Sequence, residues 1–77
     1  MKIFDVNIYM KNGRLIECSL EREVELSDVV REHSNMLELG KEGKVIEMNS
    51  SDPNDMSYVV PIANISHFEI KERYKID

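Results

Sequence analysis

Hydrophobic and polar residues alternate along the first ten positions of the chain. One set is Phe4, Val6, Ile8 and Met10, and the other is Asp5, Asn7 and Tyr9. Successive side chains of an extended backbone point to opposite faces, so the first set shares a face and the second set shares the other. The alternation therefore predicts a half-buried strand over residues 2–10.

An Asn-Gly pair at residues 12–13 follows this strand and is typical of a hairpin turn. The next apolar set is Ile16, Cys18 and Leu20. A two-residue loop would place Ile8 opposite Glu17, which would put a charged side chain on the core face. A three-residue loop that includes Lys11 places Ile8 opposite Ile16 instead, and it aligns Val6 with Cys18 and Phe4 with Leu20. We therefore expect the three-residue loop, with Gly13 in the left-handed conformation after a type I turn.

The middle of the chain has the spacing of an amphipathic helix. Its apolar stripe is Val30, His33 and Leu37, widened by Val29 and Met36, and its polar side is Asp28, Arg31, Glu32, Asn35 and Glu38. Ser27 is the expected N-cap, and Gly40 is the expected residue after the helix. An alternative for residues 36–39 is a strand paired with residues 44–48.

The last third of the chain is rich in β-branched and aromatic residues, which favour strands. Residues 45–49 predict a short strand with Ile46 and Met48 facing inward. Residues 57–71 predict two strands divided by a corner at residues 61–64, because proline cannot donate a hydrogen bond within a ladder. A tight turn there would direct Ile62 and Ile65 at the same core.

The strand after this corner should place Phe68 and Ile70 on one face and His67, Glu69 and Lys71 on the other. Its alternation continues to Tyr74 and Ile76. A strand over residues 65–76 would be roughly 40 Å long, which exceeds the width of a compact domain of this length. We expect residues 71–77 to form an extended strand tail that is either frayed or paired with another chain in association.

These segments predict one α+β domain over residues 1–77, ordered β-β-α-β-β-β. One helix should pack on one face of a mostly antiparallel sheet. The composition agrees with a globular domain, because 42% of the 77 residues are hydrophobic and 32% are charged.

Charge and hydropathy narrow the function classes. The formal net charge of −5 opposes non-specific binding to a phosphate backbone, so nucleic acid is not the expected partner. No apolar run approaches the roughly 18 residues of a membrane span. The single cysteine, Cys18, allows no disulfide within the chain. The expected location is the cytoplasm.

The residues with catalytic or metal-binding potential lack the spacing that such chemistry needs. Cys18, His33 and His67 lie far apart in the sequence and form no zinc-ligand pair. Cys18 should point into the core, where a thiol is inert. We therefore expect no cofactor, no metal and no enzymatic activity.

Protein–protein contact is the expected function, in a small binding or regulatory module that forms a homodimer. The candidate contact residues are Tyr74, Ile76, Tyr58 and Tyr9. An association between acidic and basic surfaces of two copies would weaken with added salt. The alternative is a nucleic-acid-associated small barrel that would use Lys11, Arg14, Lys71, Arg73 and Lys75.

Two segments carry a resemblance to known proteins. They are Val-Asn-Ile-Tyr-Met-Lys-Asn-Gly-Arg-Leu-Ile-Glu, residues 6–17, and Val-Val-Pro-Ile-Ala-Asn-Ile-Ser-His-Phe-Glu-Ile, residues 59–70. The pair resembles small uncharacterised proteins of Gram-positive phages and mobile elements, which implies a hairpin, a helix and a closing strand pair but no activity. It also resembles, more faintly, the Sm-like barrel. The corner at residues 61–64 lacks the glycine of that family, and the expected helix lies inside the strand order, so no binding residues are carried over.

Overall fold

The computed structural model describes residues 2–49 and 57–74. The elements in chain order are β1 (Lys2–Met10), β2 (Leu15–Glu21), α1 (Leu26–Glu38), the 3₁₀ helix η1 (Leu39–Glu42), β3 (Val45–Asn49), β4 (Ser57–Pro61), the 3₁₀ helix η2 (Ile62–Asn64) and β5 (Ile65–Tyr74). All strand pairs are antiparallel. The predicted α+β class and element order are confirmed.

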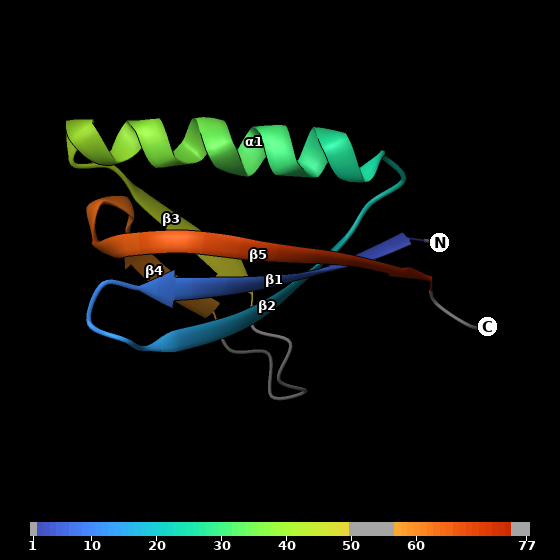
Figure 1. Cartoon of the computed structure of the whole chain (residues 1–77), viewed down its shortest axis with the longest axis horizontal. Coiled ribbons are helices and arrows are strands. Elements are labelled where there is room, and N and C mark those ends of the chain that lie inside the picture. Colours follow the sequence, from blue (N-terminus) through green and yellow to red (C-terminus); the bar gives the residue numbers. More distant parts are fainter. Residues whose placement is uncertain (1, 50–56, 75–77) are drawn as a thin grey trace.

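The strands form two sheets rather than one. The first sheet has the order β2-β1-β5, and the second consists of β3 and β4. Figure 1 shows the three strands of the first sheet side by side, with α1 along the β5 side and the β3–β4 pair behind them. The face of the first sheet that points away from β3 and β4 is therefore open.

The first hairpin has the predicted register. Ile8 pairs with Ile16, Val6 with Cys18, and Phe4 with Leu20. Gly13 has a φ of +89°, and its N–H donates to the Met10 carbonyl over 2.9 Å. The three-residue loop is confirmed, because only this loop places both apolar sets on one face.

β5 pairs with β1 along the whole length of β1, from Lys2 opposite Tyr74 to Met10 opposite Ile65. The register shifts between Tyr9 and Met10, which leaves Ser66 as an extra residue in a bulge. Because of this bulge, Ile65 and the apolar residues that follow it in β5 can face the same core. The prediction that β5 overhangs the domain is wrong for the residues up to Tyr74, because β1 is long enough to pair with β5 over this length. Residues 75–77 of the expected tail lie outside the described residues.

The core lies between the two sheets and α1. Its buried members from β1, β2, β3, β4 and β5 are Val6, Ile8, Ile16, Cys18, Met48, Val60 and Ile65, and Phe68, Ile70 and Leu37 pack partly buried against them. Phe4, Ile62, Val29 and His33 are also buried. Burial of each large apolar side chain contributes roughly 1.5–3 kcal/mol, so about ten of them can hold a domain of this size.

The helix begins earlier than predicted. Its N-cap is Glu25, not Ser27, and no side chain caps it. The helix extends to Leu26 because Leu26, Val29 and His33 then lie on one side at helical spacing. Val30 was predicted to be central to the apolar stripe but is 44% exposed. The true stripe runs through Val29 and His33 and leaves Val30 at its margin.

The helix also ends differently. Residues 36–38 are helical, so the alternative strand is not formed. Gly40 does not terminate the helix. η1 continues the chain, and Gly43 is the cap, with a φ of +71°. Gly40 is instead required for close packing, because a Cβ atom there would lie 3.1 Å from Ile62 Cγ2 and 3.2 Å from the Ala63 backbone nitrogen.

The corner between β4 and β5 has the predicted form. Pro61 ends β4, and η2 makes the turn. Ile62 and Ile65 are 2% and 4% exposed, so both reach the core as expected. The backbone N–H of Ile62 donates to the Lys44 carbonyl, which ties the corner to the start of β3.

We predict that Gly40→Ala will lower the free energy of unfolding by about 1–3 kcal/mol, because backbone as well as side-chain atoms would have to move. Urea denaturation followed by circular dichroism measures this change. Lys41→Ala is the control, because Lys41 is exposed in the same 3₁₀ helix and should change stability by less than about 0.5 kcal/mol. Equal stability of the two variants would contradict the close packing of η1 on η2.

Candidate functional site

The open side of the first sheet is here called the outer face. Its side chains come from alternate positions of the three strands: Ile3, Asp5, Asn7 and Tyr9 of β1; Leu15, Glu17, Ser19 and Glu21 of β2; and His67, Glu69, Lys71 and Arg73 of β5. The intervening residues of each strand point to the core side. The outer face was predicted strand by strand from the polar half of each alternation.

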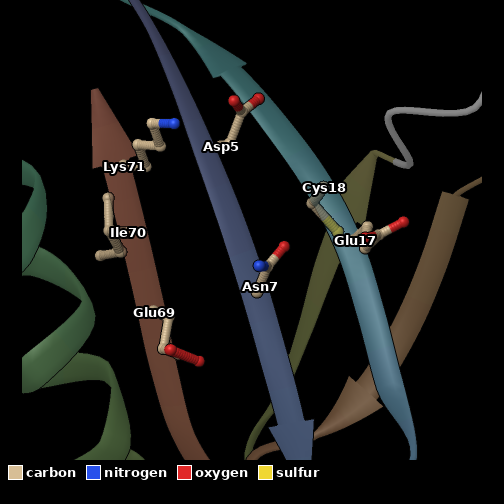
Figure 2. Close-up of a pocket in the computed structure, with 7 residues that line it drawn as sticks. All are labelled: Asp5, Asn7, Glu17, Cys18, Glu69, Ile70 and Lys71. Carbon is tan, nitrogen blue, oxygen red and sulfur yellow. The ribbon is translucent and has the colours of Figure 1, made fainter. Parts of the chain in front are cut away.

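A hollow of about 520 Å³ lies on this face. Asp5, Asn7, Glu17, Glu69 and Lys71 line it, together with Cys18 and Ile70. Figure 2 shows these residues spread over the three neighbouring strands. β1 carries the short side chains of Asp5 and Asn7, and the longer side chains of Glu17, Glu69 and Lys71 lie around them on the flanking strands. The difference in length hollows the face along β1.

The register arranges the outer face in four rows across the strands. From one end to the other they are Glu21–Ile3–Arg73, Ser19–Asp5–Lys71, Glu17–Asn7–Glu69 and Leu15–Tyr9–His67. The two middle rows are polar or charged throughout. The two end rows each bring an apolar or aromatic side chain from β1, so the face is polar at its centre and more apolar at its ends.

Asp5 connects all three strands. It accepts a hydrogen bond from Ser19 Oγ of β2 over 3.2 Å and one from Arg73 Nε of β5 over 2.7 Å. Both members of the Asp5–Arg73 ion pair are partly exposed, so solvent screens the pair and it contributes on the order of 0–1 kcal/mol. Its main effect is to neutralise Arg73 and fix its position on the face.

Tyr9 and His67 form the aromatic part of the outer face. Their rings are stacked, with centroids 4.5 Å apart and an interplanar angle of 4°. A hydrogen bond from the Tyr9 hydroxyl to Glu69 raises the Tyr9 pKa above its ordinary value, and desolvation and the charges of Glu69 and Glu17 add to the effect. Tyr9 is therefore held by His67 on one side and Glu69 on the other.

Two polar groups of the outer face have no intramolecular partner. Within residues 2–49 and 57–74, the Lys71 ammonium forms no ion pair and the Asn7 side-chain amide forms no hydrogen bond. Both line the hollow. Lys71 is exposed and Asn7 is half-buried. These groups are available to an external partner.

The structure separates the four predicted contact residues. Tyr9 lies on the outer face, but Tyr58 lies half-buried on β4, with the Arg14 guanidinium 5.9 Å from its ring centroid. Tyr74 is 68% exposed at the end of β5, opposite Lys2. Ile76 lies outside the described residues. Of the three that the structure describes, only Tyr9 is part of the outer face.

The predicted basic residues are also divided. Lys11 and Arg14 lie in and beside the first hairpin loop, next to the row of Tyr9. Lys71 and Arg73 lie further along the outer face, and Arg73 is paired with Asp5. Lys75 lies outside the described residues. The carboxylates of Asp5, Glu17 and Glu69 interrupt any positive strip along the face.

The residues considered for catalysis or metal binding lie in different places. Cys18 is buried on the core side, and burial raises its thiol pKa. His67 is exposed on the outer face, whereas His33 is buried under α1. Within the described part of the chain, no three histidine, cysteine, aspartate or glutamate side chains are grouped to hold a metal ion.

His33 is the one buried polar residue that the sequence assigned to the apolar stripe. Its Nδ1 donates to the Val29 carbonyl over 2.8 Å, and its ring meets Phe68 edge-on at 5.0 Å between centroids. No group in the described residues lies within hydrogen-bond distance of its Nε2. Hydrogen-bonded at one nitrogen and packed through its ring, His33 joins α1 to β5.

Comparisons with protein-family models, with curated proteins and with solved structures find no match. The resemblances drawn from residues 6–17 and 59–70 therefore remain predictions. In the described residues, no helix is both long and apolar enough to cross a bilayer.

We predict that Glu69→Gln will lower the Tyr9 pKa towards its ordinary value of 10.0, because it removes the charged acceptor. Glu17→Gln should lower it less, since Glu17 acts only through its charge. Carbon-13 chemical shifts of the tyrosine ring during a pH titration measure both changes. An unchanged pKa in Glu69→Gln would contradict the hydrogen bond.

The sign of the linked stability change follows from the raised pKa. Folding favours the protonated phenol, so the stabilisation from Tyr9 is complete below pH 10 and is lost as the pH rises through the raised value. Glu69→Gln should therefore reduce the alkaline loss of stability.

Proposed function

We propose that this protein is a small, non-enzymatic protein-binding module that self-associates, and that the outer face carries the contact. The observation that supports this most directly is the open face itself. No other described element covers it, and it presents Lys71 and Asn7 without intramolecular partners in a hollow of about 520 Å³. Unpaired polar groups on an uncovered face suit a protein partner that brings the complementary groups.

The composition of the outer face favours a protein partner. Aromatic and apolar side chains lie at its ends, including Leu15 at 43% exposure, and charges of both signs lie between them. Non-obligate interfaces are about as apolar as the rest of a protein surface and are enriched in tyrosine and arginine. Tyr9 and Arg73 are both held in place, by His67 and Asp5, which reduces the entropy lost on binding.

Contact through a face is favoured over contact through a strand edge. α1 lies along β5 and packs on it through His33 and Phe68, which obstructs strand addition at that edge (Figure 1). The outer edge of β2 carries Glu17 and Glu21, and charges of this kind discourage edge pairing. The predicted role of β5 in association is kept, but through its side chains.

The non-enzymatic part of the proposal is supported by the separation of the reactive groups. Cys18 is buried with a raised pKa, and a buried thiol is a poor nucleophile. His67 lies on the other face of the sheet. Neither residue is placed to activate the other.

Nucleic-acid binding is the second candidate. The observation in its favour is the stacked Tyr9–His67 pair, which lies beside Lys11 and Arg14 at one end of the sheet, since aromatic and basic groups together can bind single strands. The charge of −5 and the carboxylates within the face oppose it.

We predict no mobility shift of single-stranded or duplex oligonucleotides by this protein at low salt, up to about 100 μM protein, because phosphate contacts would have to overcome the acidic face. Lys11→Glu serves as the control for a weak signal. A shift that Lys11→Glu abolishes would favour the second candidate.

We predict that the 9.0 kDa chain will show a concentration-dependent increase in mass towards twice that value. Light scattering or sedimentation equilibrium measures the mass. Because charges meet across the contact, the dimer should weaken when salt is raised from about 50 to 500 mM.

Amide chemical shifts recorded during dilution should locate the contact. We expect the changes on β1, β2 and β5, with α1 as the internal control. A monomeric mass at every concentration would contradict self-association, and shifts confined to α1 or β4 would contradict the outer face.

A further inference from the structure

We infer that two copies pack outer face to outer face about a twofold axis that runs across the strands, between the row of Asp5 and the row of Asn7. The inference rests on the proposed function and adds the partner, a second copy of this chain, and the register. Charge complementarity between the rows of the face selects this axis.

The symmetry determines which groups meet. An axis across the strands places β1 over β1 and β5 over β5 of the second copy, and it exchanges the two middle rows. Lys71 then lies opposite Glu69 of the second copy, and Asn7 lies opposite Asp5 of the second copy. The third pair of this exchange joins Ser19 and Glu17. Each of these contacts occurs twice.

The two unpaired groups of the outer face both gain partners in this arrangement. The Lys71 ammonium meets a carboxylate, and the Asn7 amide can donate to one. Asp5 has capacity for a further bond, because a carboxylate offers about four acceptor positions and Asp5 uses two within the chain.

Four other placements of the axis bring like charges together, and an axis between the Asn7 and Tyr9 rows leaves Lys71 and Asp5 opposite no described row of the second copy. An axis through the Asp5 row places Lys71 opposite itself, and an axis through the Asn7 row places Glu69 opposite itself. A shift by one row towards the chain ends sets Lys71 against Arg73. An axis parallel to the strands sets β5 over β2, so that Glu69 faces Glu17. Like charges directly opposed are unfavourable, so these registers are excluded.

The end rows are compatible with the same axis. The exchange places Ile3 opposite Tyr9 of the second copy, an aliphatic side chain against an aromatic ring. Arg73 lies opposite His67, beside the stacked pair. The third pair of these rows sets Leu15 opposite Glu21, so the apolar match at the ends comes from Ile3 and Tyr9.

The size of the face indicates a weak dimer. Three strands about 4.8 Å apart and eight residues rising about 3.3 Å each give roughly 400 Å² in plan per copy. This is at the small end of specific interfaces, so we expect dissociation in the micromolar range or above.

Charge exchange between two variants tests the register. In the Lys71→Glu variant, two glutamates would meet across the axis, and in the Glu69→Lys variant two lysines would meet there. Each variant alone should therefore dimerise about tenfold or more weakly than the natural chain. Mixed in equal amounts, the two variants should form a heterodimer, because every Glu–Lys contact is then restored. Sedimentation with one variant isotope-labelled or tagged measures the mixed species.

The control is Lys44→Glu, which makes the same change in net charge at an exposed lysine outside the outer face. It should dimerise like the natural chain. Circular dichroism checks that each variant is folded. If Glu69→Lys does not fold, Asn7→Asp tests the same axis, because it would place two carboxylates opposite each other and should weaken the dimer.

The outcomes separate the inference from the proposed function. Recovery of the dimer in the mixture supports the inferred axis. A natural chain that dimerises with shifts on the outer face, but whose variants are not restored by mixing, overturns the axis and leaves the proposed function standing. A natural chain that is monomeric overturns both.

Discussion

The pairing of β1 with β5 is the constraint on which the rest of the structure depends. It joins the first and last described strands along nine positions, from Lys2 opposite Tyr74 to Met10 opposite Ile65. It completes the three-stranded sheet, provides the strand on which α1 packs, and brings Lys71 and Arg73 beside Asp5. Without it, the outer face would be a two-stranded hairpin, which is marginally stable by itself in water.

Local features of the fold could be predicted from the sequence. The hairpin register follows from the number of residues in the loop, since only a three-residue loop keeps Ile8 and Ile16 on one face. Pro61 and its neighbours specify the corner, because proline cannot continue a ladder. In both cases a few adjacent residues contain the whole argument.

The helix ends could not be predicted, because tertiary contacts determine them. The half-burial of Leu26 and the burial of Val29 place the helix start before the good capping residue Ser27. Gly40 suggested a helix terminus, but its role is to let η1 approach Ile62, some 20 residues later in the chain. A glycine needed for close packing and a glycine needed for a positive φ look the same in a sequence.

The candidate site was predicted only in parts. Alternation assigned Asp5, Asn7 and Tyr9 to one polar face and Glu69 and Lys71 to another. Whether the two faces are continuous depends on which strand lies beside β1, and no local pattern contains that information. Tyr74 was selected because it lies in the expected overhanging strand, and no local pattern shows that β1 accompanies β5 as far as Tyr74.

The position of β5 after the other described strands in the sequence also affects how the polypeptide folds during synthesis. The first hairpin can form as soon as it is synthesised, because its loop is short. The other partner of β1, however, is β5, which lies about 60 residues downstream of β1. Contacts between segments so far apart in the sequence are slow to form. Until that segment leaves the ribosome, β1 has one unpaired edge and an uncovered apolar side. The nascent hairpin is therefore the part of this protein most exposed to misassembly and to capture by chaperones.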